Sequence, residues 1–175
     1  MKTAKLLMVG DSLMEYGPWE KWFGDGVVNR GIGGLTTEGV YLHLNRVLKN
    51  PYDQIGLMAG NNDLLAGVPS AEILENYEKI LKKIKGQQPE DQIYVHRPLP
   101  CNTTKLYLPL DNAAVYRLGQ GLKTLAETHQ ARWVDLWDVL TKDGELKAEY
   151  TIDGIHLTEA AYDLWGERLA ALLAD

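Results

Sequence analysis

Short apolar runs alternate with segments of helical periodicity along the chain, and this alternation restricts the possible folds more than any other feature of the sequence. The runs cover residues 5–9, 26–29, 54–58, 92–96 and 131–135. Each run has the length of a β-strand, and strands separated by helices pair in parallel because each helix carries the chain back to the start of the next strand. We therefore expect an α/β fold with three layers, in which helices cover both faces of a five-stranded, mostly parallel sheet.

Four of the remaining segments have apolar residues at helical spacing. The predicted helices cover residues 40–48, 73–84, about 112–128 and a segment that begins near Thr158. Ser70 is a suitable N-cap for the second helix because its hydroxyl can accept a hydrogen bond from a free backbone N–H. Gly86 is a suitable C-terminal stop for the same helix. The last helix is expected to pack the end of the chain onto the core.

Length and composition fit a single domain spanning residues 1–175. Hydrophobic residues make up 45% of the chain and charged residues 24%, which is typical of a globular domain. No apolar run approaches the ~20 residues that cross a bilayer, so no membrane span is expected. The net charge of −6 disfavours a nucleic-acid partner, because binding to phosphates depends on clustered Lys and Arg side chains.

Two features favour a cytoplasmic location. The apolar stretch that begins at Leu6 is too short for the core of a signal peptide and already serves as the first predicted strand. Cys101 is the single cysteine, so the chain cannot form an internal disulfide, which fits a reducing compartment. We therefore expect a cytoplasmic protein.

Two short motifs at opposite ends of the chain suggest nucleophilic catalysis. The run Gly10-Asp11-Ser12-Leu13 follows the first predicted strand, and Asp153-Gly-Ile-His156 precedes the last predicted helix. A serine hydroxyl becomes a useful nucleophile when an imidazole can take its proton and a carboxylate orients that imidazole. Taken alone, each motif is more typical of an ordinary turn. Their interpretation as a site depends on two further motifs.

Both further motifs can supply hydrogen-bond donors to an oxyanion. Asn-Arg-Gly-Ile-Gly-Gly, residues 29–34, follows the second strand, and its glycines allow bare backbone amides to face a ligand. Gly-Asn-Asn-Asp, residues 60–63, follows the third strand, and an asparagine amide can donate to an oxyanion without carrying charge. Because ligands bind beyond the carboxyl ends of parallel strands, all these motifs are expected to meet at one edge of the sheet.

In this order, the blocks Gly-Asp-Ser-Leu, Gly-Ile-Gly-Gly, Gly-x-Asn-Asp and Asp-x-x-His resemble the GDSL or SGNH hydrolase family over essentially the whole chain. The resemblance implies the flavodoxin-like fold of that family. It also implies Ser12 as nucleophile, with Asp153 and His156 as the acid and base of a catalytic triad. The oxyanion donors would be the backbone amides of Ser12 and Gly34 and the side chain of Asn62.

The runs at residues 29–34 and 95–100 look most like the branch of platelet-activating-factor acetylhydrolase-like and sialate O-acetylesterase-like proteins. This resemblance implies a small-molecule ester substrate, an acetylated sugar or lipid, although thioesters and aryl esters would also fit. It requires no metal and no organic cofactor, and relatives of this size are often monomers or homodimers. One departure is visible: family members often carry Asp after the second-block glycine, where this chain has Leu35.

Several assignments stay open from the sequence alone. Asp135 and Asp138 follow the last strand and compete with Asp153 for the role of triad acid. His96 ends a strand at the catalytic edge and could touch substrate, whereas His43 and His129 have positions typical of structural residues. The aromatic segment with Tyr16, Trp19, Trp22 and Phe23, and the segment 97–107, could wall a pocket.

Two other functional classes remain as alternatives. A metal-dependent phosphoesterase also uses Gly-Asp and Gly-Asn-x-Asp turns at strand ends, but it needs several histidine ligands, and this chain offers only His156 in a convincing position. A non-catalytic carbohydrate- or lipid-binding module could retain the same fold without the chemistry.

Overall fold

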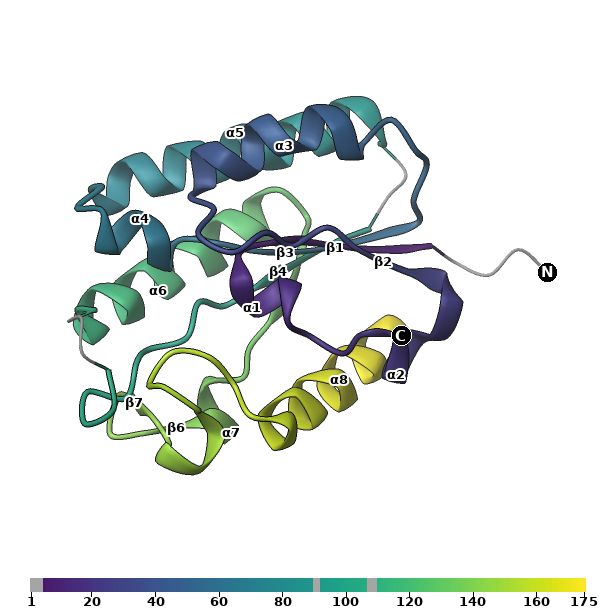
Figure 1. Ribbon diagram of the computed structural model, residues 1–175. Coiled ribbons are helices and arrows are strands. Elements are labelled where there is room, and N and C mark those ends of the chain that lie inside the picture. Colours follow the sequence, from purple (N-terminus) through teal and green to yellow (C-terminus); the bar gives the residue numbers. More distant parts are fainter. Residues whose placement is uncertain (1–4, 90–91, 107–109) are drawn as a thin grey trace.

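The computed structural model describes residues 5–89, 92–106 and 110–175 (Figure 1). One sheet of five strands lies at its centre, formed by β1 (Leu6–Gly10), β2 (Val27–Asn29), β3 (Gln54–Met58), β4 (Gln92–His96) and β5 (Arg132–Val134). The spatial order is β2-β1-β3-β4-β5, and every neighbouring pair is parallel. The predicted α/β architecture is confirmed, with strand ends displaced by one residue at most from the predicted runs.

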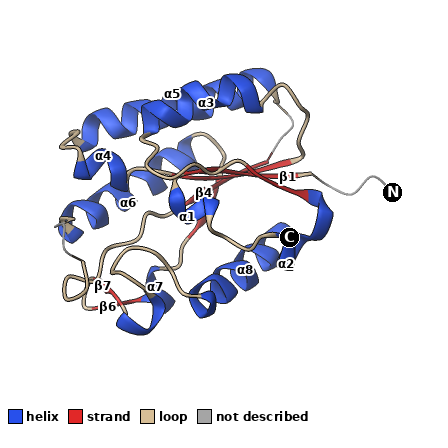
Figure 2. Ribbon diagram, viewed as in Figure 1, coloured by secondary structure: helices blue, strands red, loops and turns tan. Residues whose placement is uncertain are grey.

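Helices cover both faces of this sheet, as Figures 1 and 2 show. The long helices are α3 (Thr37–Val47), α5 (Ser70–Gln87), α6 (Asn112–Thr128) and α8 (Glu159–Leu173). Side chains of α3, α5 and α6 share one apolar cluster with the sheet. Side chains of α8 share a second cluster with the short helices α1 (Ser12–Glu15) and α7 (Trp137–Leu140). The three layers therefore enclose two cores, one on each side of the sheet.

The alternation of side chains along β1 explains why the chain needs both cores. Leu7 and Val9 belong to the cluster under α3, α5 and α6, whereas Leu6 and Met8 belong to the cluster under α8. Successive strand residues point to opposite faces, so a central parallel strand is apolar on both sides. This is why the first strand reads as a continuous apolar run rather than an alternating one.

The helix starts follow the predictions in two of three cases. Thr158 caps α8, because its hydroxyl accepts from the backbone N–H of Ala161. The third helix begins at Asn112 as predicted. The prediction for Ser70 was wrong: Ser70 is the first residue of α5, and Pro69 takes the N-cap position without a side-chain bond. Helix α5 continues one residue beyond Gly86.

Several short elements were not predicted from the sequence. They are α2 (Glu20–Phe23), α4 (Asn61–Leu65), two 3-10 turns at Gly24–Gly26 and Ala148–Tyr150, and a hairpin of β6 (Thr141–Lys142) and β7 (Glu145–Leu146). Elements of two to five residues are too short to show a hydrophobic period. Among the helices in the described ranges, none has the length and apolar character required to cross a membrane.

Candidate active site

The first strand leads directly into the helix that carries Ser12. Gly10 ends β1 with φ +153°, and a Cβ atom at this position would lie 2.0 Å from the carbonyl oxygen of Met58 on β3. Only glycine allows the chain to turn this close to the neighbouring strand. Asp11 then caps α1, because its Oδ1 accepts from the N–H of Leu13 at 3.0 Å. Ser12 is therefore the first helical residue, at the carboxyl end of the sheet.

Ser12, His156 and Asp153 form one chain of hydrogen bonds. Ser12 Oγ lies 3.1 Å from His156 Nε2, and His156 Nδ1 lies 2.6 Å from Asp153 Oδ2. An ionised carboxylate can only accept, so Nδ1 carries the proton and Nε2 offers a lone pair to the serine hydroxyl. Residues 144 positions apart in the sequence thus meet in the geometry that the sequence analysis expects for a nucleophile and its base.

Local backbone contacts hold the carboxylate of Asp153 beneath the imidazole. Its Oδ1 accepts from the backbone N–H groups of Ile155 and His156, at 2.9 and 2.7 Å. Partial burial would raise the pKa of Asp153, but the bonds from the His156 side chain and from these two amides lower it to about 2. Asp153 is therefore ionised across the physiological range of pH.

The second and third blocks face each other beside Ser12. Gly34 adopts φ +81°, and the Asn62 side-chain amide donates to the carbonyl of Leu35 at 3.0 Å. An amide NH₂ group has two hydrogens, so Asn62 keeps one for a further acceptor. Within the described ranges, the backbone N–H groups of Ser12 and Gly34 donate to no other group. Three donors are therefore free at this edge of the sheet.

Leu35 does not leave the second-block loop loose. Its side chain packs against the core under α3, and its Cδ2 lies 2.8 Å from where a Cβ on Gly39 would be. Its backbone N–H donates to the carbonyl of Ile32 at 3.3 Å. The departure from the family pattern thus replaces an acidic side chain by an apolar anchor.

A buried carboxylate fixes the third block to the start of α3. Asp63 is 1% exposed and accepts from both the backbone N–H and the hydroxyl of Thr37, the hydroxyl at 2.6 Å. Burial raises the pKa of Asp63, and the bonds from Thr37 only partly offset this. Asn76 on α5 also donates to the Thr37 hydroxyl, at 3.0 Å. Asn62 therefore stands on a short helix, α4, that is tied to two longer ones.

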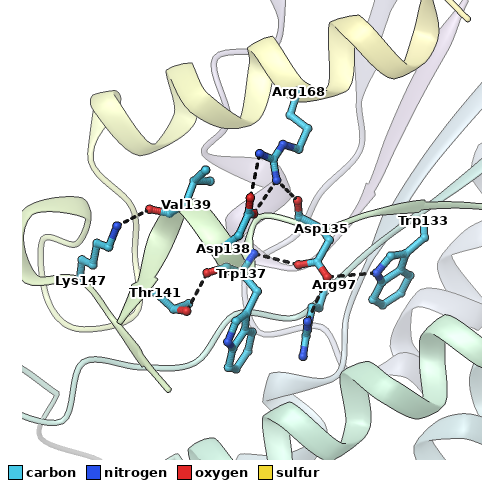
Figure 3. Close-up of polar contacts among 9 residues, drawn as sticks. All are labelled: Arg97, Trp133, Asp135, Trp137, Asp138, Val139, Thr141, Lys147 and Arg168. Carbon is cyan, nitrogen blue, oxygen red and sulfur yellow. Dashed lines mark hydrogen bonds and ion pairs between the residues drawn. The ribbon is translucent and has the colours of Figure 1, made fainter. Parts of the chain in front are cut away.

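Asp135 and Asp138, the rival candidates for the triad acid, are engaged with arginines (Figure 3). Asp135 accepts from Arg97 Nη1 at 3.0 Å and from the backbone N–H of Trp137 at 2.8 Å. Asp138 pairs with Arg168 at 2.6 Å, and this hydrogen bond holds the pKa of Asp138 below its usual range. The Nδ1 atom of His156 instead has Asp153 as its partner.

His96 does not reach the catalytic edge, contrary to the possibility raised by its place at a strand end. It is 1% exposed, and its Nδ1 accepts from the indole N–H of Trp165 at 2.8 Å. Burial lowers the pKa of His96 to about 3, so the ring is neutral. Strand β4 is central, and its last side chain points into the core under α8.

His43 and His129 make the structural contacts expected for them. His43 Nε2 lies 3.1 Å from the carbonyl of Arg30, and His129 is the C-cap of α6, with Nε2 3.5 Å from Glu78. Among the described residues, no group of three or more His, Cys, Asp or Glu side chains could hold a metal ion.

The loops that carry the site also carry exposed apolar side chains. Four of the large exposed ones lie within four positions of a candidate site residue: Tyr16 (59% exposed), Ile32 (41%), Leu65 (40%) and Ile152 (70%). The Tyr16 and His156 rings lie 5.6 Å apart. Each of the four sequence blocks that carry candidate site residues thus has an exposed apolar side chain in it or next to it.

The segments expected to wall a pocket are divided between core and surface. Trp19 is 2% exposed and packs edge-on against Trp165, so it belongs mainly to the core. It also borders a cavity of about 290 Å³ together with Pro18 and Asn29. Thr103 borders a larger cavity of about 660 Å³ between α6 and the β6–β7 hairpin. Tyr107, at the end of the second segment, lies outside the described residues.

Glu15 was not singled out by the sequence, and Asn29 was noted only as the first residue of the second block. Glu15 accepts from the backbone N–H of Gly33 at 2.8 Å, and the Asn29 side chain donates to the carbonyls of Met14 and Glu15 at 3.0 and 2.9 Å. Glu15 follows Ser12 by three positions in a helix, and this spacing is the one signal that could have identified it.

Comparison with known proteins identifies a family model and a solved structure that match most of the chain. The model of the GDSL-like Lipase/Acylhydrolase family matches residues 8–164. A solved structure from Streptococcus pneumonia, described as a platelet activating factor, is similar over 97% of this chain and 84% of its own, with 33% identity and a TM-score of 0.88.

Two curated relatives show how far the similarity extends. An N-acylneuraminate cytidylyltransferase of Streptococcus agalactiae serotype V is 28% identical over 78% of this chain, which spans only 32% of that longer protein. An isoamyl acetate-hydrolyzing esterase 1 homolog of Bos taurus is 23% identical, over 88% of this chain and 75% of the relative. The family match covers most of the chain and includes the first three blocks together with the Asp153–His156 pair, so this protein belongs to the GDSL-like lipase/acylhydrolase family.

Proposed function

We propose that this protein is a serine esterase that hydrolyses short-chain acyl esters, with acetyl esters as the preferred class. The observation that carries the proposal is the continuous hydrogen-bonded chain from Ser12 Oγ through His156 to Asp153, with links of 3.1 and 2.6 Å. Such a chain turns a weakly acidic hydroxyl into a nucleophile, because the base and its orienting acid are already in place.

Acylation begins when Ser12 Oγ attacks the ester carbonyl carbon. His156 Nε2 takes the hydroxyl proton as the new C–O bond forms, and Asp153 stabilises the resulting imidazolium. The proton then passes from Nε2 to the leaving alkoxide as the original ester bond breaks. The acyl group stays bound to Ser12 Oγ as an acyl-enzyme, and the protonated alcohol leaves.

The negative charge of the tetrahedral intermediate needs donors aimed at the oxygen. We assign this role to the backbone N–H groups of Ser12 and Gly34 and to the free amide hydrogen of Asn62. Water then attacks the acyl-enzyme with His156 as base, which releases the carboxylic acid and restores the Ser12 hydroxyl. No step in this scheme calls for a cofactor.

The surroundings of Ser12 favour a short acyl group. Exposed apolar side chains lie in or next to each sequence block of the site, at Tyr16, Ile32, Leu65 and Ile152, and we assign to them an apolar rim for the acyl group. A short acyl chain can be covered by such a rim, whereas a long chain needs a deep apolar channel to leave water. The similarity to an isoamyl acetate-hydrolyzing esterase homolog also points to an acetyl ester.

The test is hydrolysis of p-nitrophenyl acetate, butyrate and octanoate by the wild type and by Ser12→Ala, each assayed without and with EDTA. We expect the wild type to cleave acetate fastest and octanoate slowest, and Ser12→Ala to be inactive. Loss of wild-type activity on adding EDTA would indicate a metal-dependent esterase instead.

A fluorophosphonate probe provides the second measurement. An enzyme with an activated Ser12 should be labelled once per chain, and Ser12→Ala should not be labelled. A wild type that neither cleaves these esters nor takes the probe would overturn the proposal and favour a binding module with the same fold.

A further inference from the structure

We infer that Glu15 is a positioning residue for the oxyanion hole: its carboxylate holds the second-block loop so that the Gly34 amide faces the carbonyl oxygen of the substrate. This inference rests on the proposed function, because it assigns Gly34 as a donor. Glu15 lies on α1, the helix that carries Ser12, and would be a further residue on which the rate of acyl transfer depends.

The contact that carries the inference joins two separate blocks. Gly33 N–H donates to Glu15 Oε2 at 2.8 Å, although the two residues are 18 positions apart. Glu15 follows Ser12 by about one helical turn, so both side chains leave α1 on the same side. A Cβ on Gly33 would lie 3.1 Å from Glu15 Oε2 and 3.7 Å from Ser12 Cβ. The carboxylate thus meets the loop beside the nucleophile.

The second-block loop needs such a contact because its two glycines place little restriction on the backbone conformation. Gly33 and Gly34 are consecutive glycines, and Gly34 has φ +81°, a conformation that costs glycine little to enter and little to leave. The Gly34 amide belongs to the peptide that joins these two residues. A bond to the N–H of Gly33 holds the preceding peptide, Ile32–Gly33, and so limits the movement of the loop that could turn the donor away.

The other side of the donor is held from the third block. The Asn62 amide donates to the Leu35 carbonyl at 3.0 Å, and the Leu35 N–H closes a turn onto Ile32 at 3.3 Å. Glu15 and Asn62 thus bind the residues directly before and after Gly34. If one of these contacts is lost, the peptide between them is held at one end only.

Other contacts, made by Asn29 and Gly31, hold the second-block loop against α1. The Asn29 side chain accepts from Gly31 N–H at 3.0 Å and donates to two carbonyls of α1. Gly31 lies so close to the helix that a Cβ would be 2.3 Å from the backbone nitrogen of Glu15. Because these contacts keep the loop on α1 without the carboxylate, removing the Glu15 side chain should alter the aim of the Gly34 amide and leave the fold intact.

The experiment compares Glu15→Ala with Glu15→Gln, which keeps an acceptor oxygen of the same reach. Glu20→Ala is the matched control, since it removes another exposed carboxylate five positions further along the chain. kcat and KM for p-nitrophenyl acetate are measured per active site, counted by fluorophosphonate titration, so that misfolded protein does not contribute. Thermal midpoints are recorded for every variant.

We expect Glu15→Ala to lower kcat about 10- to 100-fold with KM changed less than threefold, because a misaimed donor weakens the transition state more than the bound ester. Glu15→Gln and Glu20→Ala should stay within threefold of the wild-type kcat. An unchanged kcat in Glu15→Ala, or equal losses in the Ala and Gln variants, would overturn the inference.

The outcomes separate this inference from the proposed function. If the wild type is inactive, or if Ser12→Ala is as active as the wild type, the esterase proposal itself fails, and the role of Glu15 fails with it. If hydrolysis depends on Ser12 but not on Glu15, only the positioning role fails. A loss confined to KM would also count against it, since a donor for the transition state acts on kcat.

Discussion

Asp11 is the residue whose environment conflicts most with its charge. It is 5% exposed, and burial raises its pKa to about 6, although the N–H of Leu13 and the nearby His156 act in the opposite direction. The carboxylate caps α1 and so helps to place Ser12. At neutral pH the protein therefore keeps a buried negative charge directly before its candidate nucleophile.

This conflict predicts a stability that depends on pH. The pKa of Asp11 is higher in the folded protein than in the unfolded chain, so the folded state binds the proton more tightly and stability from this group falls as pH rises from about 4 to about 6. Asp11→Asn keeps a capping oxygen and cannot ionise. Relative to this variant, the wild type should gain roughly 2 kcal/mol in unfolding free energy between pH 7 and pH 4.

Urea denaturation of both proteins at several pH values would measure the difference in unfolding free energy. Asp138→Asn, which changes an exposed carboxylate whose pKa is lowered by Arg168, is the control: relative to this variant, the wild type should show no gain in unfolding free energy on acidification. A difference between wild type and Asp11→Asn that does not vary with pH would contradict the prediction.

The triad acid is predicted to be Asp153. Asp153→Asn keeps the size of the side chain but can place an NH₂ group against His156 Nδ1, which would favour the wrong imidazole tautomer. We expect kcat to fall by about 10⁴-fold. Steady-state hydrolysis of p-nitrophenyl acetate measures this, with Asp138→Asn as the control for the rival acid. Comparable losses in both variants would leave the assignment of Asp153 without support.

Asn62 is predicted to act on the transition state. Asn62→Ala removes a side-chain donor and should lower kcat by roughly 10²–10³-fold, or ~2.7–4 kcal/mol of transition-state stabilisation. Asn61→Ala is the neighbouring control, since the Asn61 amide donates instead to the carbonyl of Leu99. The two variants are compared by kcat per titrated active site. Similar activities would argue that Asn62 is a structural residue.

Two helical glycines show that the packing around a helix determines whether a Gly→Ala substitution stabilises or destabilises the protein. A Cβ added to Gly86 on α5 would meet no heavy atom within 4 Å, whereas a Cβ on Gly166 of α8 would lie 2.3 Å from the indole of Trp22. Gly86→Ala should raise the free energy of unfolding by about 0.4–1 kcal/mol, because alanine reduces the entropy of the unfolded chain. Gly166→Ala should lower it by about 1–3 kcal/mol through overpacking.

Thermal or urea unfolding of the two variants provides the test. If both substitutions raised the free energy of unfolding, helix propensity rather than packing of α8 on the segment around Trp22 would dominate at these positions. Enzymatic activity per active site should stay at the wild-type level in Gly86→Ala.

At the scale of elements, the long ones were predictable and the short ones were not. Helix α5 shows its apolar stripe over 18 residues, which a period of 3.6 residues reveals clearly. Helix α4 has five residues and depends on the buried bond between Asp63 and Thr37. A contact between residues 26 positions apart leaves no local pattern, so the support of Asn62 could not be derived from its own segment.

Over the whole molecule, the C-terminal helix supports the nucleophile at the opposite end of the chain. The Tyr162 hydroxyl donates to the carbonyl of Leu13 at 2.8 Å, across 149 positions of sequence. Trp19 packs between α8 and α1 and donates to the carbonyl of Met14 at 2.8 Å. The position of Ser12 therefore depends on docking of α8.

Arg97 joins the elements at the far edge of the sheet. It is 8% exposed, its guanidinium lies 4.2 Å from the Trp137 ring and 5.0 Å from the Tyr116 ring, and Asp135 is its ionic partner (Figure 3). Arg168 on α8 reaches the same segment through the Asp135 carbonyl. Arg97, Asp135 and Arg168 therefore connect the ends of β4 and β5 with α8.

Asp135→Ala should therefore destabilise the whole domain. It leaves a buried guanidinium without its carboxylate, and because the Asp135 side chain is itself 34% exposed, the expected loss lies between that of an exposed and a buried pair, about 1–3 kcal/mol in unfolding free energy. The remaining folded protein should keep its kcat per active site. Urea unfolding monitored by tryptophan fluorescence measures the loss. A change below about 1 kcal/mol would show that the pair is exposed enough to be replaced by water.

The fold class, the sheet of parallel strands and the edge at which the four motifs meet could all be predicted from the amino-acid sequence. They could be predicted because the spacing of apolar residues and the turn residues that follow each strand are patterns among residues close together in the sequence. Three contacts became visible only in the folded protein: His96 faces the core, Asp135 pairs with Arg97, and Glu15 binds the Gly33 amide. Such contacts depend on how separate elements are placed within a few tenths of an ångström, which no local pattern records.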